Sequence, residues 1–219
     1  MRITAVQAIV RRLMIGSEFQ SAMVSMGGVG STALARHIGS IADKTVKEHA
    51  YSPCMYDGTR NLRLGYMFGN PYNAVLSVFR RNFQQMHAKA MHADSPTLPP
   101  DLRGVTLEAY LEKGIDAFSI ERQFDNWVSQ PHSRHPTLLI KYESLANNID
   151  DVLAFFGVKD AFGVKERQSS WRDQPPHIRT GLERMYGKLN EKIEAMPEIH
   201  ILSSGDQGQP LTQQTLEAS

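Results

Sequence analysis

The chain has 219 residues, of which 41% are hydrophobic and 21% are charged, which is an ordinary composition for a soluble globular domain with its own core. The formal net charge is +1, so no overall basic field indicates a nucleic-acid partner, and any anion site must be local. The single cysteine, Cys54, excludes an intrachain disulfide and favours a cytoplasmic protein. No apolar run approaches the ~20 residues of a membrane span.

Apolar periodicity predicts alternating strands and helices along most of the chain. The expected strands are Ala22–Ser25, Thr45–His49, Leu62–Phe68 and Thr137–Lys141. The expected helices cover residues 1–20, 31–42, 71–83, 107–128 with a break near Gly114, 148–156 and 178–195. Residues 84–104 contain three prolines and few large apolar side chains, so an irregular excursion is expected there, and long loops of this kind are often functional.

This alternation predicts an α/β fold of three layers around a central, mainly parallel sheet with right-handed crossovers. We expect one domain over residues 1–200, with residues 84–130 forming an excursion and helix on the acceptor side, and a disordered tail over residues 201–219 that is rich in Ser, Gly and Gln. Ligands of such sheets bind at the carboxyl ends of the strands. The glycine-rich turn, His49 and Gly69 each follow an expected strand and should gather at that edge.

A glycine-rich turn, Gly27-Gly28-Val29-Gly30-Ser31-Thr32, links the first expected strand to a helix. Glycines allow the backbone to present its N–H groups to an anion, and the helix start adds a partial positive charge. Ser31 and Thr32 can donate their hydroxyls to phosphate oxygens. Ser31 stands where the lysine of a Walker motif would be, so a tight turn without a ligand remains an open interpretation.

Four segments, in this order and spacing, resemble the sulfotransferases that use 3′-phosphoadenosine 5′-phosphosulfate (PAPS). The resemblance covers residues 20–198 and implies a sulfotransferase fold related to that of P-loop nucleotide kinases. Besides the glycine-rich turn, the segments are Lys47-Glu48-His49, Gly69-Asn70-Pro71 with the helix that follows it, and Leu138-Leu139-Ile140-Lys141-Tyr142-Glu143.

The resemblance implies roles for particular residues. The glycine-rich turn would hold the 5′-phosphosulfate, with Ser31 and Thr32 as its hydroxyl pair. Lys47 would contact the leaving phosphate and His49 would be the general base, and both side chains project from one face of a strand because they are two residues apart. Ser77 would bind the 3′-phosphate.

Two basic residues that are usual in the family are glycines here, at Gly28 and at Gly69. Lys47 is the expected substitute for the first lost charge. The expected substitutes for the second are Arg80, Arg81, Lys165 and Arg167.

The sequence therefore predicts an enzyme that transfers a sulfuryl group from PAPS, as co-substrate and without a metal, to a hydroxyl of a carbohydrate or small molecule. Two alternatives stay open: a P-loop nucleotide kinase or ATPase, and a non-catalytic nucleotide- or glycan-binding protein with the same fold. His132 and His135 have a metal-like spacing but suit a plain loop between prolines, while His87 and His92 lie where an acceptor could bind. The acceptor and the oligomeric state are not indicated.

Overall fold

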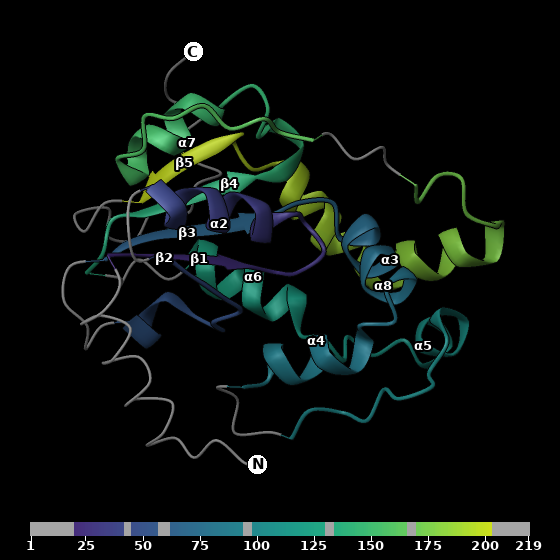
Figure 1. Ribbon diagram of the computed structural model, residues 1–219. Coiled ribbons are helices and arrows are strands. Elements are labelled where there is room, and N and C mark those ends of the chain that lie inside the picture. Colours follow the sequence, from purple (N-terminus) through teal and green to yellow (C-terminus); the bar gives the residue numbers. More distant parts are fainter. Residues whose placement is uncertain are drawn as a thin grey trace.

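The computed structural model describes residues 20–41, 45–56, 62–93, 98–129, 134–165 and 170–202. This part of the chain forms an α/β fold in which a five-stranded, mainly parallel mixed sheet is flanked by seven helices (Figure 1). The helix expected near the N-terminus, Arg167, His132 and residues 203–219 lie outside the described residues. None of the helices in the described ranges is long and apolar enough to cross a membrane.

The sheet contains all four predicted strands and one that the sequence did not reveal. Its members are β1 (Ser21–Ser25), β2 (Thr45–Glu48), β3 (Arg63–Phe68), β4 (Thr137–Lys141) and β5 (Ile199–Leu202). They are arranged in the order β2-β1-β3-β4-β5, with the first four parallel and β5 antiparallel to β4. β5 includes Ile201 and Leu202, which the sequence prediction places in the tail. This edge strand has only four residues and none is fully buried, so it lacks the apolar run that marks the inner strands.

The helices follow the prediction except within residues 84–104. They are α2 (Ser31–Ile41), α3 (Pro71–Arg80), α4 (Gln84–Met91), α5 (Leu107–Lys113), α6 (Ile120–Ser129), α7 (Ile149–Phe156) and α8 (Pro176–Glu194). The expectation that residues 84–104 are irregular is wrong for α4, because its Gln, Met, Ala and Lys residues favour a helix and the prolines come only later. The break expected near Gly114 is confirmed: Gly114 ends α5 in the left-handed conformation with φ of 62°, and α6 begins at Ile120.

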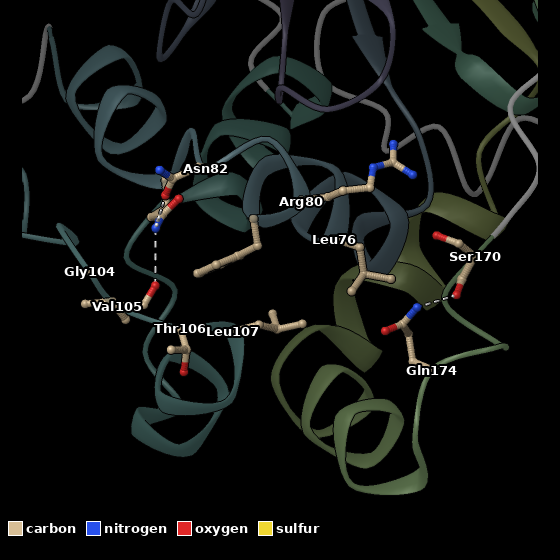
Figure 2. A pocket seen from close by; sticks show the side chains of 11 residues that line it. Leu76, Arg80, Asn82, Gly104, Val105, Thr106, Leu107, Ser170 and Gln174 are labelled. Atoms are coloured by element: carbon tan, nitrogen blue, oxygen red, sulfur yellow. Dashed lines mark hydrogen bonds between the residues drawn. The ribbon is translucent and has the colours of Figure 1, made fainter.

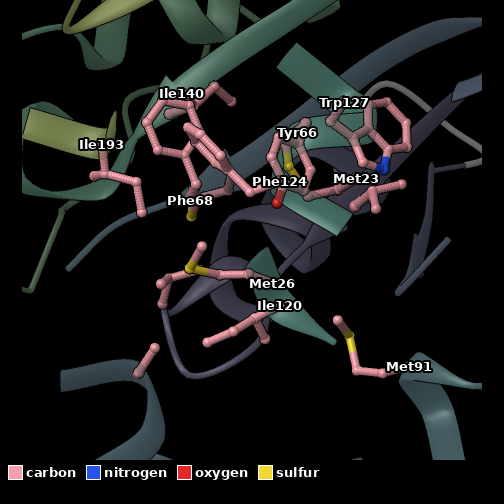
Figure 3. Close-up of a cluster of buried hydrophobic side chains, with 14 of the residues drawn as sticks. Met23, Met26, Tyr66, Phe68, Met91, Ile120, Phe124, Trp127, Ile140 and Ile193 are labelled. Atoms are coloured by element: carbon pink, nitrogen blue, oxygen red, sulfur yellow. The ribbon is translucent and has the colours of Figure 1, made fainter. Parts of the chain in front are cut away.

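Helices cover both faces of the sheet. A Cβ placed on Gly65 of β3 would lie 2.7 Å from Phe156 of α7, whereas the next residue, Tyr66, stacks on Trp127 of α6 with ring centroids 5.1 Å apart. Successive strand residues point to opposite faces, so α7 and α6 lie on opposite sides. In Figure 3 Tyr66, Phe124 and Trp127 lie together on the α6 side, where Phe68 also meets Phe124 edge-on.

The chain passes from β1 to β2 on one side of β1 and returns to β3 on the other side. This reversal creates a crevice at the carboxyl edge, which is the usual ligand position in open α/β sheets. The turn after β1 meets the start of α3 there, since a Cβ on Gly28 would lie 2.5 Å from the carbonyl oxygen of Ala74.

Candidate functional site

The turn between β1 and α2 has the backbone geometry of an anion cradle. Gly27, Gly28 and Gly30 adopt left-handed φ values of 88°, 72° and 75°. Within the described residues the backbone N–H groups of Gly28, Val29 and Gly30 have no hydrogen-bond partner. The loop leads directly into α2, whose first N–H groups also lack partners inside the helix. Together these donors can bind a phosphate or sulfate group.

Close packing prevents a side chain at residue 28 of this turn. The start of α3 occupies the space that a Cβ on Gly28 would need, since the Ala74 backbone lies 2.5 to 2.9 Å from that position. Any larger side chain at residue 28 would have to displace helix backbone and adopt a strained positive φ. A lysine is therefore excluded from this position by the packing of α3.

A cavity of about 300 Å³ lies beside the turn and gathers residues from distant parts of the chain. Three of its side chains are cations, Arg36, Lys47 and Arg81, and two are imidazoles, His49 and His87. No Asp or Glu is among the described residues that line it. The complete lining is Gly27, Gly28, Gly30, Ser31, Thr32, Ala33, Arg36, Lys47, His49, Val78, Arg81, Phe83 and His87. The cavity therefore suits an anionic ligand.

The predicted pair Lys47 and His49 lines this cavity, and its hydrogen bonds fix which ring nitrogen of His49 carries the proton. Lys47 Nζ and His49 Nε2 are 2.5 Å apart, and an ammonium can only donate, so Nε2 accepts. The proton is therefore on Nδ1, which donates to the carbonyl of Ser25 at 2.8 Å. Glu48 points the other way, as expected for alternate strand residues, and accepts from Tyr56 at 2.7 Å.

Burial sets the charge of this pair. Burial, and secondarily the Lys47 ammonium, lowers the pKa of His49 to about 4. Burial and the nearby Arg81 lower the pKa of Lys47 to about 8. Near pH 7 the imidazole is therefore neutral and the ammonium remains mostly charged, which are the states that a base and an anion-binding group require.

The two hydroxyls of the turn differ in position. Ser31 is buried and donates to Ser25 Oγ at 2.8 Å, while Thr32 is exposed at the first turn of α2. Ser25 was missed by the sequence analysis although it ends β1, where its hydroxyl supports the turn. Val29, assigned to the site from the sequence, is buried in the core and does not line the cavity.

The predicted 3′-phosphate residues do not converge on one place. Ser77 is buried, and its hydroxyl has no hydrogen-bond partner within the described residues. Of the described residues expected to replace the 3′-phosphate cation, Arg81 lines the glycine-turn cavity, where its Nε donates to the carbonyl of Ser77 at 2.9 Å. Lys165 is exposed and does not line that cavity.

Arg80 lines a second cavity of about 560 Å³ between α3, α5 and the segment before α8. Figure 2 shows Arg80 and Leu76 on α3, across from Ser170 and Gln174, which are joined by a hydrogen bond of 3.0 Å. Arg80 and Arg81 therefore serve different cavities although they are adjacent in the sequence.

A carboxylate lies next to Gly69. A Cβ on Gly69 would lie 3.0 Å from both carboxylate oxygens of Glu143. Glu143 accepts the backbone N–H of Asn70 at 2.7 Å, and burial raises the pKa of its carboxyl group. The structure thus places an acidic group at the start of α3.

Among the cations and imidazoles of the lining, Arg36 and His87 were not assigned to the nucleotide site from the sequence. Arg36 follows Thr32 by one helical turn on α2, a spacing that puts both on one face and could have indicated it. His87 comes from α4, which was expected to be irregular, and the sequence placed it only where an acceptor could bind. His135 is structural, because Leu62 N donates to its Nδ1 at 3.2 Å and its Nε2 lies 2.8 Å from the Tyr56 carbonyl.

Among the described residues no cluster of three or more His, Cys, Asp or Glu side chains could hold a metal ion. Comparison of the chain with protein-family models, curated protein sequences and solved structures found no match. The function must therefore be argued from the geometry of the site.

Proposed function

We propose that the protein is a sulfotransferase that moves a sulfuryl group from PAPS to a hydroxyl of a small molecule or carbohydrate. On this proposal residues 20–202 form a sulfotransferase domain of the P-loop nucleotide-kinase type, with the turn of residues 27–32 as its phosphate loop. One observation carries it: in the described part of the chain, one cavity is lined by unpaired backbone N–H groups, three cations and a neutral lysine-bonded imidazole, and by no Asp or Glu.

In this reaction the acceptor oxygen attacks sulfur, and the bond between sulfur and the bridging phosphate oxygen breaks. The electrons of that bond stay on the leaving 5′-phosphate, whose growing charge is stabilised by the turn and by Arg36, Lys47 and Arg81. The acceptor proton passes to a neutral imidazole in the cavity. The resemblance implies His49, and its Nε2 becomes available when Lys47 turns from the imidazole to the leaving phosphate.

A second candidate is a nucleotide-binding protein that does not transfer sulfuryl groups. The carboxylate of Glu143 beside Gly69 favours it, because a negative charge there opposes a 3′-phosphate. A P-loop kinase or ATPase is the third candidate, since the same backbone cradle suits the phosphates of ATP.

Calorimetry with 3′-phosphoadenosine 5′-phosphate, ATP and GTP separates the three candidates. We expect the bisphosphate to bind, and Lys47→Ala and Arg81→Ala each to weaken it at least tenfold, or about 1.4 kcal/mol. Arg103→Ala is the matched control, since it also removes one positive charge but from an exposed ion pair with Asp101. Binding of ATP without the bisphosphate would exclude a PAPS enzyme, and bisphosphate binding without consumption of PAPS would favour the non-catalytic protein.

The other predicted substitutes for the 3′-phosphate cation are tested with Arg80→Ala, Lys165→Ala and Arg167→Ala. If neither these three nor Arg81→Ala weakens bisphosphate binding tenfold, no cation replaces the missing arginine, and the non-catalytic candidate gains.

A further inference from the structure

His87 places a second imidazole against the glycine-rich turn. It is 6% exposed and lies on α4, and its ring packs so closely on the backbone that a Cβ on Gly27 would lie 2.0 Å from its Cε1 atom. The ring meets His49 edge-on, with centroids 5.3 Å apart and planes at 82°. Both imidazoles line the same cavity.

The two imidazoles differ in which ring nitrogens are occupied. Both nitrogens of His49 are bonded, one to Ser25 and the other to Lys47. The His87 ring bonds the backbone carbonyl of Met26, which uses one nitrogen as a donor. No hydrogen bond of its other nitrogen is found among the described residues. In a neutral imidazole that nitrogen carries a lone pair, so His87 has an available acceptor and His49 does not.

The surroundings hold His87 neutral and in place. Burial, and then the neighbouring His49, Lys47 and Arg81, lower the pKa of His87 well below its usual value. Phe118 packs against the ring with centroids 5.0 Å apart, and the backbone N–H of His87 is bonded to the carbonyl of Phe83 at 2.8 Å. The ring is therefore a fixed, uncharged acceptor at the edge of a cationic cavity.

We propose that His87 is the catalytic base of the sulfuryl transfer: its free ring nitrogen accepts a hydrogen bond from the acceptor hydroxyl and takes the proton as the oxygen–sulfur bond forms. This inference rests on the proposed function and names the base within it. The imidazolium formed on His87 returns its proton to water after the product leaves. His49 is then a positioning residue that holds Lys47 beside the leaving phosphate. The hydrogen bond between Lys47 and His49 does not have to break before the proton is transferred.

The test uses water as the acceptor, because the natural acceptor is unidentified. Conversion of PAPS to the bisphosphate is followed in a single turnover for the wild type, His87→Gln, His49→Gln and His92→Gln. Glutamine can keep an N–H donor for Met26 but is not a base. His92 is the matched control, because it ends the same helix and is bonded to the carbonyl of Ala117 at 3.1 Å, outside the cavity.

We expect His87→Gln to slow conversion by about 10²-fold or more, the usual contribution of a general base, with bisphosphate affinity within about threefold of wild type and His92→Gln unchanged. A His87→Gln rate near that of the wild type, with His49→Gln slowed 10²-fold, would overturn this inference and leave the sulfotransferase proposal standing. A wild type that neither binds the bisphosphate nor consumes PAPS would overturn both.

Nitrogen-15 NMR of the wild-type histidines makes the test independent of variants that fail to fold. We expect His87 to show one protonated nitrogen and one unprotonated nitrogen without a hydrogen bond near pH 7, and His49 to show a proton on Nδ1 alone. A His87 ring that is protonated on both nitrogens would overturn the inference.

Discussion

Replacing Gly27 by alanine tests whether the turn and α4 are packed as tightly as the structure shows. The new Cβ would lie 2.0 Å from Cε1 of His87 and within 2.9 Å of both ring nitrogens, and the backbone would keep a φ of 88°. The positive φ costs an alanine about 1–2 kcal/mol. The overlap with a ring fixed by its neighbours adds about 1–3 kcal/mol. We expect a total loss of about 2–5 kcal/mol in the free energy of unfolding.

Gly104→Ala is the matched control, because Gly104 has a similar φ of 68° and no heavy atom within 4 Å of its Cβ position. It should lose only the conformational contribution of about 1–2 kcal/mol. Urea unfolding of both variants gives the two free energies by linear extrapolation. The same pair of substitutions in a His87→Ala background isolates the contact, since without the ring the difference between them should disappear. Equal losses for Gly27→Ala and Gly104→Ala in the wild-type background would refute the close packing of His87 on the turn.

Three further outcomes are expected. The pKa of His49 is about 4 in the folded protein and ~6.5 in an unfolded chain, so the unfolded chain binds more protons between these values. The free energy of unfolding should therefore fall by about 3 kcal/mol as pH is lowered through this window. In urea titrations His49→Gln should reduce this dependence of stability on pH, and an unchanged dependence would contradict the burial argument. Asn73 Oδ1 accepts the N–H groups of Ser170 and Trp171 at 3.1 and 3.2 Å. Asn73→Ala should therefore lower the free energy of unfolding by about 1–3 kcal/mol and speed hydrogen exchange at these two amides. Unaltered exchange would show that the bonds are not formed. Arg36→Ala should weaken binding of inorganic pyrophosphate about tenfold, roughly 1.4 kcal/mol, with Arg36→Lys retaining most of it; equal affinity in calorimetry would remove Arg36 from the anion site.

Much of the fold follows from local sequence patterns. The inner strands are short apolar runs because parallel strands are buried on both faces, and four of the five strands of the described sheet could be predicted from this signal. The start of α3 also follows from neighbouring residues, since Pro71 takes the first helical position and the Asn70 side chain accepts the N–H of Asn73 at 3.0 Å. The edge strand β5 and the helix α4 were missed, because neither carries a strong periodic signal in the residues themselves.

The glycine-rich turn and the Lys47–His49 pair could be predicted because each is a contiguous motif next to a strand end. What the loop can bind was decided by tertiary packing. The backbone of Ala74 excludes a side chain at residue 28, and Glu143, 74 residues after Gly69 in the chain, lies beside it. The turn, the strand end and α4 meet only when α3 and α4 fold across the carboxyl edge of the sheet, and this brings His87 to His49. A pattern of neighbouring residues determines which element forms, but contacts between elements depend on how their faces pack, and no local pattern in this chain encodes them.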